Sequence, residues 1–322
     1  MRAQVFTASG QVLSEDRDIP TPSRGEVLIK TAAVGLCGTD DHLLTGEFEG
    51  AGDPIVPGHE ASGWVEACGE GVDLPVGQPV TINPNTMCGV CEFCQDGRSN
   101  LCTDWDGRGV MRTDGCAQDF FLAPAMNVFP LKATTNVYHA ALVEPLACVL
   151  HAFDRIPRRL GDHFLVYGAG TMGLLTAQVA PRAGAATVTV ADTNPERRRA
   201  AADVGCERVV ERGTDGERQK YDVVIDCTGN TRAIEDGLGR LAPGGTYLQI
   251  GVTPDTAKIE LSTFDLYRQE WTLAGSLIVL GTFRRAVEMF EAGVINSEAM
   301  ISHTFPLEEL EQAVALFRSG AS

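Results

Sequence analysis

The pattern of hydrophobic and polar positions divides the chain into two regions. Up to about residue 146, short apolar runs such as 26–30 and 77–82 alternate with turns rich in glycine and proline. This pattern predicts a β-rich region of short strands and long loops. Beyond it, apolar strands alternate with stretches of helical period: strands at 163–167, 186–192, 221–226 and 246–251, and helices at 172–180 and 195–203.

Strands and helices in such alternation pack as a parallel sheet with helices on both faces. The sequence therefore predicts an α/β protein, in which a β-rich region is joined to a doubly wound parallel sheet. Two amphipathic helices are expected after the sheet, at residues 283–292 and 307–317.

A glycine-rich turn lies between the first predicted strand of the sheet and the helix that follows. Gly168, Gly170 and Gly173 fit the pattern G-x-G-x-x-G, and the next predicted strand ends at Asp192, about twenty residues later. The first two glycines allow a tight turn and a close approach of backbone to a pyrophosphate, and the third lets the helix pack on the strand. In this context a dinucleotide-binding loop is favoured over an ordinary turn.

Asp192 would accept hydrogen bonds from the hydroxyls of the adenosine ribose and repel a 2′-phosphate, which favours NAD over NADP. Arg197, Arg198 and Arg199 follow closely and would neutralise such a phosphate, so NADP stays the second choice. The other cofactor-binding candidates are Thr171, Met172, Arg197, Gly251 and Val252.

Four cysteines, Cys88, Cys91, Cys94 and Cys102, have the spacing C-x2-C-x2-C-x7-C. Thiolates at such spacings converge on one tetrahedral Zn2+, and four of them leave no coordination position for a substrate. The cluster therefore predicts a structural zinc site and places the chemistry elsewhere. Five other cysteines suit buried apolar positions: Cys68, Cys116, Cys148, Cys206 and Cys227.

The composition disfavours several classes of protein. The chain of 322 residues is 44% hydrophobic and has no apolar stretch long enough for a membrane span. The N-terminal segment becomes charged at 14–18, so no signal peptide is expected, and ten cysteines in a reduced cytoplasm suit metal binding better than disulfides. A net charge of −17 disfavours a nucleic-acid partner, which requires a basic face.

A second group of potential metal ligands lies in segments 37–42 and 58–60, which contain Cys37, His59 and Glu60. A catalytic zinc takes few protein ligands and keeps one position open, and mixed cysteine, histidine and carboxylate ligands provide this. Each residue alone has a plainer interpretation, since a lone histidine beside glycine is usually a loop residue and a lone cysteine usually lies in a core.

Together these motifs resemble the zinc-dependent medium-chain alcohol dehydrogenases. Residues 58–60 with Gly63, Gly69 and Val72 reproduce the signature G-H-E-x2-G-x5-G-x2-V, and the four-cysteine segment matches that family's structural-zinc lobe. The run Val143-Glu144-Pro145-Leu146-Ala147 resembles the sorbitol-type, or polyol, branch, in which a glutamate replaces a cysteine ligand. Asp192 and Arg197 also match that branch.

The resemblance covers essentially the whole chain and implies two domains. These are a GroES-like catalytic domain, residues 1–146 and 279–322, and a Rossmann-type NAD-binding domain, residues 147–278. It also implies a homodimer or homotetramer. The family usually ends with a further strand, whereas this sequence ends at Ser322, so a short member and a truncated sequence both stay open.

The resemblance also implies the ligands of the catalytic zinc. By position, Cys37 and His59 are expected to bind it. Glu60 is a ligand in the sorbitol-type enzymes and lies behind the ligands in some relatives, and Glu144 is expected to bind directly or through water. Asp40 is expected to orient a ligand histidine.

Two further residues resemble a proton path. Thr39 resembles the hydroxyl that takes the proton of the alcohol, and His42 resembles the group that passes it to solvent through the cofactor ribose. The plainer interpretation makes Thr39 a helix cap and His42 a surface histidine.

The expected activity is hydride transfer between NAD and a secondary hydroxyl of a polyol, sugar or cyclitol, with two Zn2+ ions per chain. A simple alcohol, a threonine-like hydroxy amino acid and an aminocyclitol biosynthetic intermediate stay open as substrates. A non-catalytic binder of zinc and dinucleotide is a rival from another class, opposed by the intact set Cys37, Thr39, His42, His59 and Glu60. A zinc-ribbon interaction module is opposed by the acidic charge.

Overall fold

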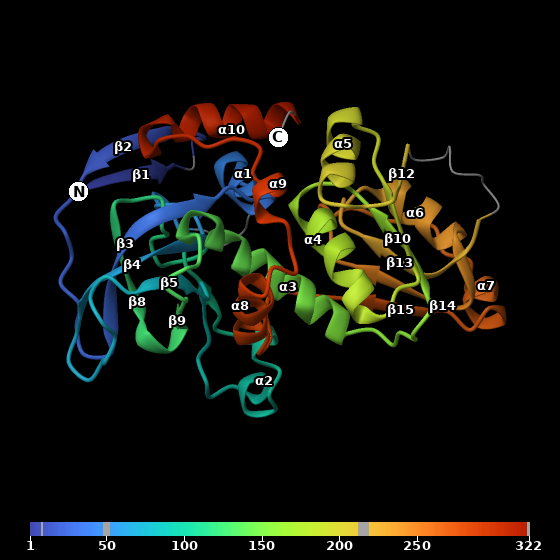
Figure 1. Cartoon of the computed structure of the whole chain (residues 1–322), viewed down its shortest axis with the longest axis horizontal. Helices are drawn as coiled ribbons and strands as arrows, with labels where there is room; N and C mark the ends of the chain where they lie inside the picture. Colours follow the sequence, from blue (N-terminus) through green and yellow to red (C-terminus); the bar gives the residue numbers. More distant parts are fainter. Residues whose placement is uncertain (8, 48–51, 212–218, 321–322) are drawn as a thin grey trace. The chain divides into compact units, whose positions relative to one another are not determined.

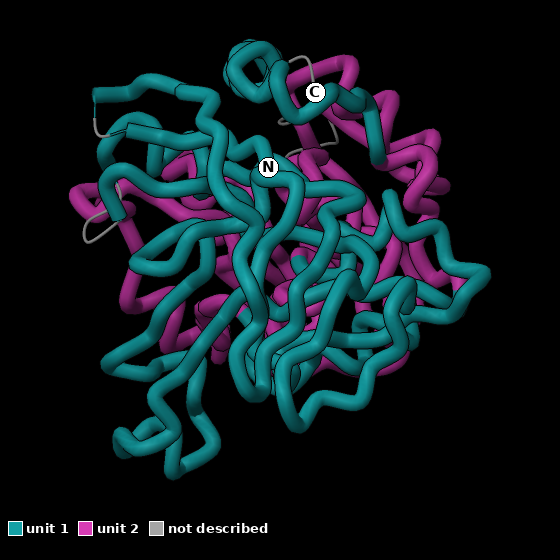
Figure 2. Tube along the Cα trace, turned by 90° about the vertical axis from the view of Figure 1, so that its left-hand side faces the viewer, with its two compact units in different colours: residues 1–144, 279–292, 301–322 teal, residues 145–278, 293–300 magenta. Residues whose placement is uncertain are grey.

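The computed structural model describes residues 1–7, 9–47, 52–211 and 219–320, and the chain forms two compact units (Figures 1 and 2). Unit 1 comprises Met1–Glu144, Val279–Ala292 and Ile301–Ser322, and unit 2 comprises Pro145–Ile278 and Gly293–Met300. Figure 2 shows the last part of the chain returning to unit 1 after unit 2.

The core of unit 1 lies on a five-stranded antiparallel sheet in the order β8-β3-β4-β5-β9. Residues two apart on one strand, such as Val27 and Ile29 or Val80 and Ile82, face the same hydrophobic core because side chains alternate across a strand. The strands are β3 (Glu26–Gly35), β4 (Glu60–Cys68), β5 (Pro79–Ile82), β8 (Phe120–Pro124) and β9 (Val128–Pro130).

Smaller elements complete unit 1. Two antiparallel pairs are β1 (Arg2–Phe6) with β2 (Val12–Asp16), and β6 (Asn85–Thr86) with β7 (Asp106–Gly107). The helices are α1 (Gly38–Thr45), α2 (Glu92–Gln95), α8 (Phe283–Glu291) and α10 (Leu310–Ser319), and the 3-10 turns are Ser99–Leu101, Ala125–Asn127, Val137–Leu142 and Leu307–Glu309. Val314 of α10 packs in one cluster with Leu43 and Leu44 of α1.

Unit 2 is built on a six-stranded parallel sheet in the order β12-β11-β10-β13-β14-β15. The strand order reverses between β10 and β13, so their carboxyl ends flank the point at which such sheets bind ligands. The strands are β10 (His163–Tyr167), β11 (Thr187–Ala191), β12 (Arg208–Val210), β13 (Tyr221–Asp226), β14 (Leu241–Gln249) and β15 (Thr272–Gly275).

Helices cover both faces of this sheet. Tyr167 packs with Ile234 of α6 on one face, while the preceding Val166 packs with Leu174 of α4 and Ala201 of α5 on the other. The helical elements are α3 (Val143–Asp154, which starts in unit 1), α4 (Thr171–Val179), the 3-10 turn Ala180–Ala183, α5 (Pro195–Asp203), α6 (Thr231–Gly239), α7 (Thr263–Arg268) and α9 (Ser297–Met300).

The predicted alternation of strands and helices is confirmed, and β10, β13 and α5 have the predicted bounds. β14 begins at Leu241, earlier than the predicted 246. Its pairing with β13 shifts register between Tyr221 and Val223, which accommodates the Pro243-Gly244-Gly245 run that looks like a turn in the sequence. Within the described ranges, no helix has the length and apolar character needed to cross a bilayer.

Candidate metal and cofactor sites

The register of β3 and β4 brings the first group of candidate ligands together. Gly35, the last residue of β3, pairs with Glu60, the first residue of β4. Cys37 follows shortly after this pair and His59 directly precedes it, so segments far apart in the sequence meet at one end of the sheet. The ligand atoms of Cys37, His59 and Glu60 all lie within 4.8 Å of one another.

Two glycines make room for this arrangement. A Cβ atom on Gly35 would lie 2.2 Å from Glu60 Oε2, so the glutamate side chain occupies the space above this glycine. Gly58 has a φ of +93°, and a Cβ there would lie 2.6 Å from Val34 Cγ1. Sequence reasoning missed Gly35, because only the strand register places it opposite Glu60.

Asp40 ties the two ligand-bearing segments together. Its carboxylate is buried and accepts hydrogen bonds from the backbone N–H of Cys37 (2.9 Å) and of Gly58 (3.2 Å). His59 Nδ1 lies 3.8 Å from Asp40 Oδ1, beyond hydrogen-bond distance, and has no hydrogen-bond partner among the described residues. A metal-bound histidine donates its other ring N–H to such a carboxylate, so the orphaned nitrogen and the donor set fit a zinc ligand oriented by Asp40.

Burial controls the protonation of this group. It raises the pKa of Cys37, with the charge of Glu60 adding to the shift, and it raises the pKa of Glu60 to about 8, with Glu144 adding. For His59, burial alone would lower the pKa, but a hydrogen bond with Cys37 and the charge of Asp40 raise it well above its ordinary value. Acidic ligands this deeply buried hold their protons without a cation, and a divalent cation would let them ionise.

The remaining candidates of this site lie on α1 and α3. Thr39 Oγ1 is 3.8 Å from Cys37 Sγ. His42 lies three residues further along α1, on the same helix face, and its Nδ1 is 2.7 Å from Glu47 Oε2. Glu144 is buried and close enough to influence the pKa of Glu60, but it is not one of the three residues whose ligand atoms converge.

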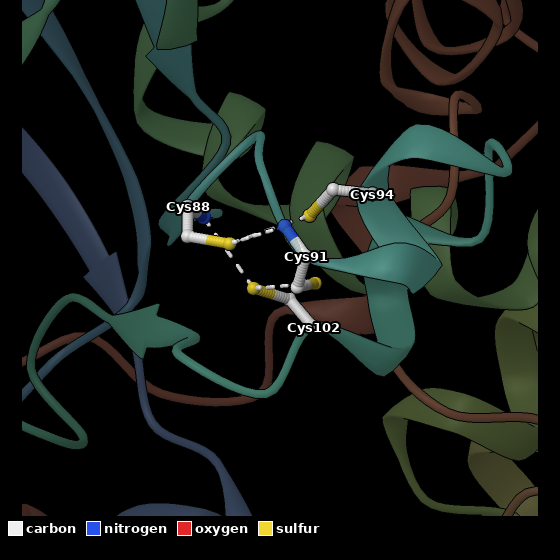
Figure 3. Close-up of side chains that lie close together, drawn as sticks. All are labelled: Cys88, Cys91, Cys94 and Cys102. Carbon is white, nitrogen blue, oxygen red and sulfur yellow. Dashed lines mark hydrogen bonds between the residues drawn. The ribbon is translucent and has the colours of Figure 1, made fainter.

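The four cysteines form the second group, in the lobe that contains α2 (Figure 3). Their sulfur atoms lie within 4.8 Å of one another, with 4.0 Å between Cys88 and Cys94 and 3.9 Å between Cys91 and Cys102. A tetrahedral zinc with sulfur ligands at about 2.3 Å separates those sulfurs by about 3.8 Å, whereas a disulfide requires about 2.05 Å. The spacing therefore fits zinc.

Backbone N–H groups point at these sulfur atoms. Cys88 N–H donates to Cys102 Sγ and Cys91 N–H donates to Cys88 Sγ, both at 3.3 Å. Backbone N–H groups of Thr103 and Cys94 lower the pKa of Cys91 to about 6, whereas burial and the neighbouring thiols raise the pKa of Cys94 to about 12. The four thiols therefore need a cation in order to ionise together.

The base of this lobe is closed independently of the cysteines. β6 and β7 pair Asn85 with Gly107, and Trp105 Nε1 donates to Asn85 Oδ1 at 2.8 Å. Asn127 Nδ2 donates to the backbone oxygen of Asn85, also at 2.8 Å. These bonds fix the chain on both sides of the cysteine segment, before Cys88 and after Cys102. No sequence pattern predicts these hydrogen bonds, because Asn85, Trp105 and Asn127 are far apart in sequence.

In unit 2, the glycine-rich turn has the geometry of a phosphate-binding loop. Gly168 has a φ of +92°, and a Cβ on Gly173 would lie 1.8 Å from Gly168 O, so α4 packs directly on the turn. Around Gly170, at the N-cap of α4, a Cβ would meet no atom within 4 Å. Thr171 and Met172 lie in the first turn of α4, where backbone N–H groups have no partner within the helix and can bind a phosphate.

Asp192 links the end of β11 to this turn. Its Oδ2 accepts a hydrogen bond from Ala169 N–H at 2.8 Å, and its Oδ1 accepts one from Asn194 N–H at 2.7 Å. Arg197, on α5, has a buried Nε without a hydrogen-bond partner among the described residues. A buried donor without a partner is satisfied when a polar or anionic ligand binds to it.

Two loops at the carboxyl ends of β13 and β14 pack closely. A Cβ on Gly251 would lie 2.2 Å from Gly229 N, and a Cβ on Gly229 would lie 1.9 Å from Val252 O. Asp226 joins these loops, because its Oδ2 accepts hydrogen bonds from Gly229 N–H and Gln249 Nε2. The side chain of Val252 is left exposed at this edge of the sheet.

Comparison with known proteins assigns the family. Residues 23–133 match the alcohol dehydrogenase GroES-like domain, and residues 171–292 match the zinc-binding dehydrogenase domain. D-arabinitol dehydrogenase 1 of Uromyces fabae is 32% identical over 92% of this chain and 88% of its own length. The chain belongs to the zinc-binding alcohol dehydrogenase family.

Other dehydrogenases agree with this assignment. D-altritol 5-dehydrogenase of Agrobacterium fabrum is 32% identical over 96% of this chain and 94% of its own length. A crystal structure described as a zinc-binding dehydrogenase from Sinorhizobium meliloti 1021, bound to NADP, has a TM-score of 0.93 and 34% identity, and the match covers 97% of this chain and 94% of that chain. The expected family, its GroES-like and Rossmann-type fold and its class, an NAD(P)-dependent dehydrogenase, are confirmed.

Proposed function

We propose that this dehydrogenase transfers a hydride between NAD and a secondary hydroxyl of a polyol, sugar or cyclitol. The observation that carries the proposal is the buried convergence of Cys37, His59 and Glu60 at the junction of β3 and β4. The relatives that act on D-arabinitol and D-altritol support the substrate class. In this proposal the catalytic domain comprises residues 1–146 and 279–322, and residues 147–278 bind the dinucleotide.

In this site Cys37, His59 and Glu60 hold a zinc ion, which when bound acts as a Lewis acid and lowers the pKa of the substrate hydroxyl. Asp40 fixes the two ligand-bearing segments through its hydrogen bonds to the N–H groups of Cys37 and Gly58. Glu144 is buried close enough to Glu60 to raise its pKa, and it supplies a further carboxylate that binds the metal directly or through water.

Thr39 takes the hydroxyl proton and His42, one helical turn away, passes it towards solvent. Thr39 lies next to the ligand Cys37, and the side chain of His42 is 38% exposed, so the path leads outward along α1. NAD, when bound, accepts the hydride. The residues proposed to hold it are Gly168, Gly170, Thr171, Met172, Gly173, Asp192, Arg197, Gly251 and Val252.

Cys88, Cys91, Cys94 and Cys102 hold a second zinc that has no open position and fixes the lobe around α2. None of the ten cysteines, all within the described residues, forms a disulfide, which agrees with a metal-binding protein of the reducing cytoplasm, where we propose that it works.

A substrate screen tests the activity. NAD reduction is followed with D-arabinitol, D-altritol, sorbitol and myo-inositol, and with ethanol and L-threonine as representatives of the other substrate classes. We expect turnover of at least one polyol or cyclitol, with a kcat/KM at least about tenfold higher than that for ethanol or L-threonine. Turnover of ethanol or threonine alone would refute the substrate class, and no turnover of any compound would favour a non-catalytic binder.

The preference for NAD over NADP is tested with the substrate that the screen identifies. Because the Asp192 carboxylate lies against the glycine-rich turn, we expect NADP to support at least about tenfold lower kcat/KM than NAD. Equal values with both cofactors would refute the assignment of Asp192 as the selecting residue.

We also propose that the dehydrogenase assembles with copies of itself, as a dimer or tetramer. β15 is an edge strand that pairs with β14 alone among the described strands, and it is largely exposed. Leu273 on this strand and Phe264 and Tyr267 on α7 are also exposed. Open edges of this kind pair readily with another chain. Light scattering of the purified protein that gives a monomer mass at micromolar concentration would contradict this assembly.

A further inference from the structure

The end of α1 places a carboxylate against His42. Gly46 adopts the left-handed conformation, with a φ of 74°, and its N–H donates to Leu43 O at 3.2 Å. The N–H of Glu47 donates to His42 O at 3.0 Å. These two bonds form the Schellman motif that ends many helices, and in this motif the residue after the glycine lies over the last turn of the helix.

In this position Glu47 reaches the imidazole. Its Oε2 lies 2.7 Å from His42 Nδ1, within the range of a strong charge-assisted hydrogen bond. An ionised carboxylate can only accept, so Nδ1 must carry the proton. In the neutral ring Nε2 is then the acceptor.

We propose that Glu47 is a positioning residue for the proton path: it holds His42 in the tautomer whose Nε2 can accept the proton that leaves the substrate hydroxyl. This inference rests on the proposed function, in which Thr39 and His42 carry that proton. When Nε2 takes the proton, the imidazolium keeps its hydrogen bond to the Glu47 carboxylate. The proton then leaves from Nε2 to solvent, and His42 returns to the same tautomer.

The surroundings of His42 agree with this role. Exposure increases outward from the buried ligands, to 38% for the side chain of His42 and 63% for that of Glu47, so a proton released here reaches water. Asp41, the other carboxylate next to His42 on α1, forms an ion pair with Arg318 of α10. The last turn of a helix also stabilises a cationic side chain through the helix dipole.

A pair this exposed contributes little to the stability of the fold. The same pair can still select the tautomer of His42. The two tautomers of a free imidazole differ little in energy, so one charge-assisted hydrogen bond decides between them. The proposal therefore predicts a spectroscopic change without a loss of folding.

The test uses the zinc-loaded full chain labelled with 15N in its six histidines. Nitrogen–proton correlation spectra, with His42→Gln to assign the signal, show which ring nitrogen of His42 carries the proton. We expect Nδ1–H in the wild-type chain and in Glu47→Gln, whose amide oxygen still accepts, and a shift to the Nε2–H form in Glu47→Ala. Glu66→Ala removes an exposed carboxylate of β4 and is the matched control.

Kinetics supply the second readout. With the polyol found in the screen, we expect the kcat of Glu47→Ala to fall about tenfold with little change in KM. Glu47 contacts His42 of the proton path and does not contact the substrate. Glu66→Ala should match the wild type. An Nε2–H tautomer in the wild-type chain, or equal tautomers and equal kcat in Glu47→Ala and Glu66→Ala, would overturn the assignment of Glu47 alone. A wild-type chain that oxidises no polyol would overturn the proposed function instead.

Discussion

The two candidate metal sites of this dehydrogenase differ in how the chain builds them. The four-cysteine group comes from one short segment, is partly exposed, and is held at its base by β6, β7 and the Asn85–Trp105 bond. The group of Cys37, His59 and Glu60 is assembled by the pairing of β3 with β4 and is largely buried.

The chemistry follows from this difference. Four thiolates fill the coordination shell of zinc, so the four-cysteine site can stabilise the fold but cannot bind a substrate. The buried site has mixed donors and an orphaned nitrogen on His59, and burial raises the pKa of each of its acidic members. A cation bound there would let these groups ionise, and three protein ligands would leave it one tetrahedral position for a substrate. The comparison predicts that the two sites respond oppositely to mutation: one loses activity and the other loses stability.

The largest effect is expected from Cys37→Ala. Loss of this thiolate should remove the Lewis acid and lower kcat/KM by at least about a thousandfold, with the fold retained. Zinc content should fall from about two ions per chain to about one. Cys206→Ala, which removes a half-buried thiol of unit 2, is the matched control and should keep both ions and full activity. Two zinc ions retained in Cys37→Ala would show that this cysteine is not a ligand.

Cys102→Ser is expected to reduce stability instead of activity. It should also lose about one zinc ion, but the cost should appear as stability, about 3 kcal/mol and about 5 °C or more in Tm. At a temperature where the variant is folded, kcat/KM should stay within about threefold of the wild type. A loss of activity as large as that of Cys37→Ala would break the distinction between the sites.

The pH dependence of the zinc-free protein sharpens the comparison. Cys37, Asp40, His59 and Glu60 all have raised pKa values in the fold, so the folded state binds protons more tightly than the unfolded state. Stability of the zinc-free chain should therefore fall, by on the order of 1–2 kcal/mol, as the pH rises from about 4.5, the unfolded pKa of Glu60, to about 6. Above that pH the lowered pKa of Cys91 acts in the opposite sense.

Zinc should reverse this trend, because metal binding needs deprotonated ligands and grows stronger as the pH rises. Urea unfolding midpoints of the zinc-free and zinc-loaded chains at several pH values measure both slopes. Glu60→Gln should flatten the slope of the zinc-free chain. A zinc-free chain that becomes more stable between pH 4.5 and 6 would contradict the burial of these groups in their protonated forms.

The smallest effect is expected from Trp105→Phe. This change removes the N–H that satisfies the buried Asn85 Oδ1, at a cost of about 1–2 kcal/mol in the free energy of unfolding. Both zinc ions should stay bound, but a chelator should extract the lobe zinc faster than from the wild type. Unchanged extraction would mean that the base of the lobe does not help to hold its metal.

The parts of the fold that sequence predicts are those in which neighbours in sequence are neighbours in space. The cysteine spacing and the glycine-rich turn are of this kind, and Asp192 is predicted because the strand–helix–strand unit after the turn has a characteristic length. Helix α6 is not among the predicted elements, and it contains two residues that are unfavourable within a helix, Gly237 and Gly239. The structure explains Gly237, because a Cβ there would lie 3.1–3.4 Å from Val224, Tyr167 and Tyr247.

The catalytic candidates needed the structure for a physical reason. Motifs name Cys37, His59 and Glu60, but their convergence depends on strand register, and register also makes Gly35 necessary. Glu47 has a local signal, a glycine that ends the helix of His42, yet the hydrogen bond itself depends on side-chain geometry. Whether Glu144 binds the metal stays a prediction.

X-ray absorption at the zinc edge tests the division between the two sites most directly. In the wild-type chain we expect a sulfur shell at about 2.3 Å together with a nitrogen and oxygen shell at about 2.0–2.2 Å, since the buried site mixes cysteine, histidine and carboxylate. In Cys37→Ala the sulfur shell should remain alone, because only the four-cysteine site keeps its ion. A nitrogen and oxygen shell that persists undiminished in Cys37→Ala, or that is absent from the wild type, would contradict this account.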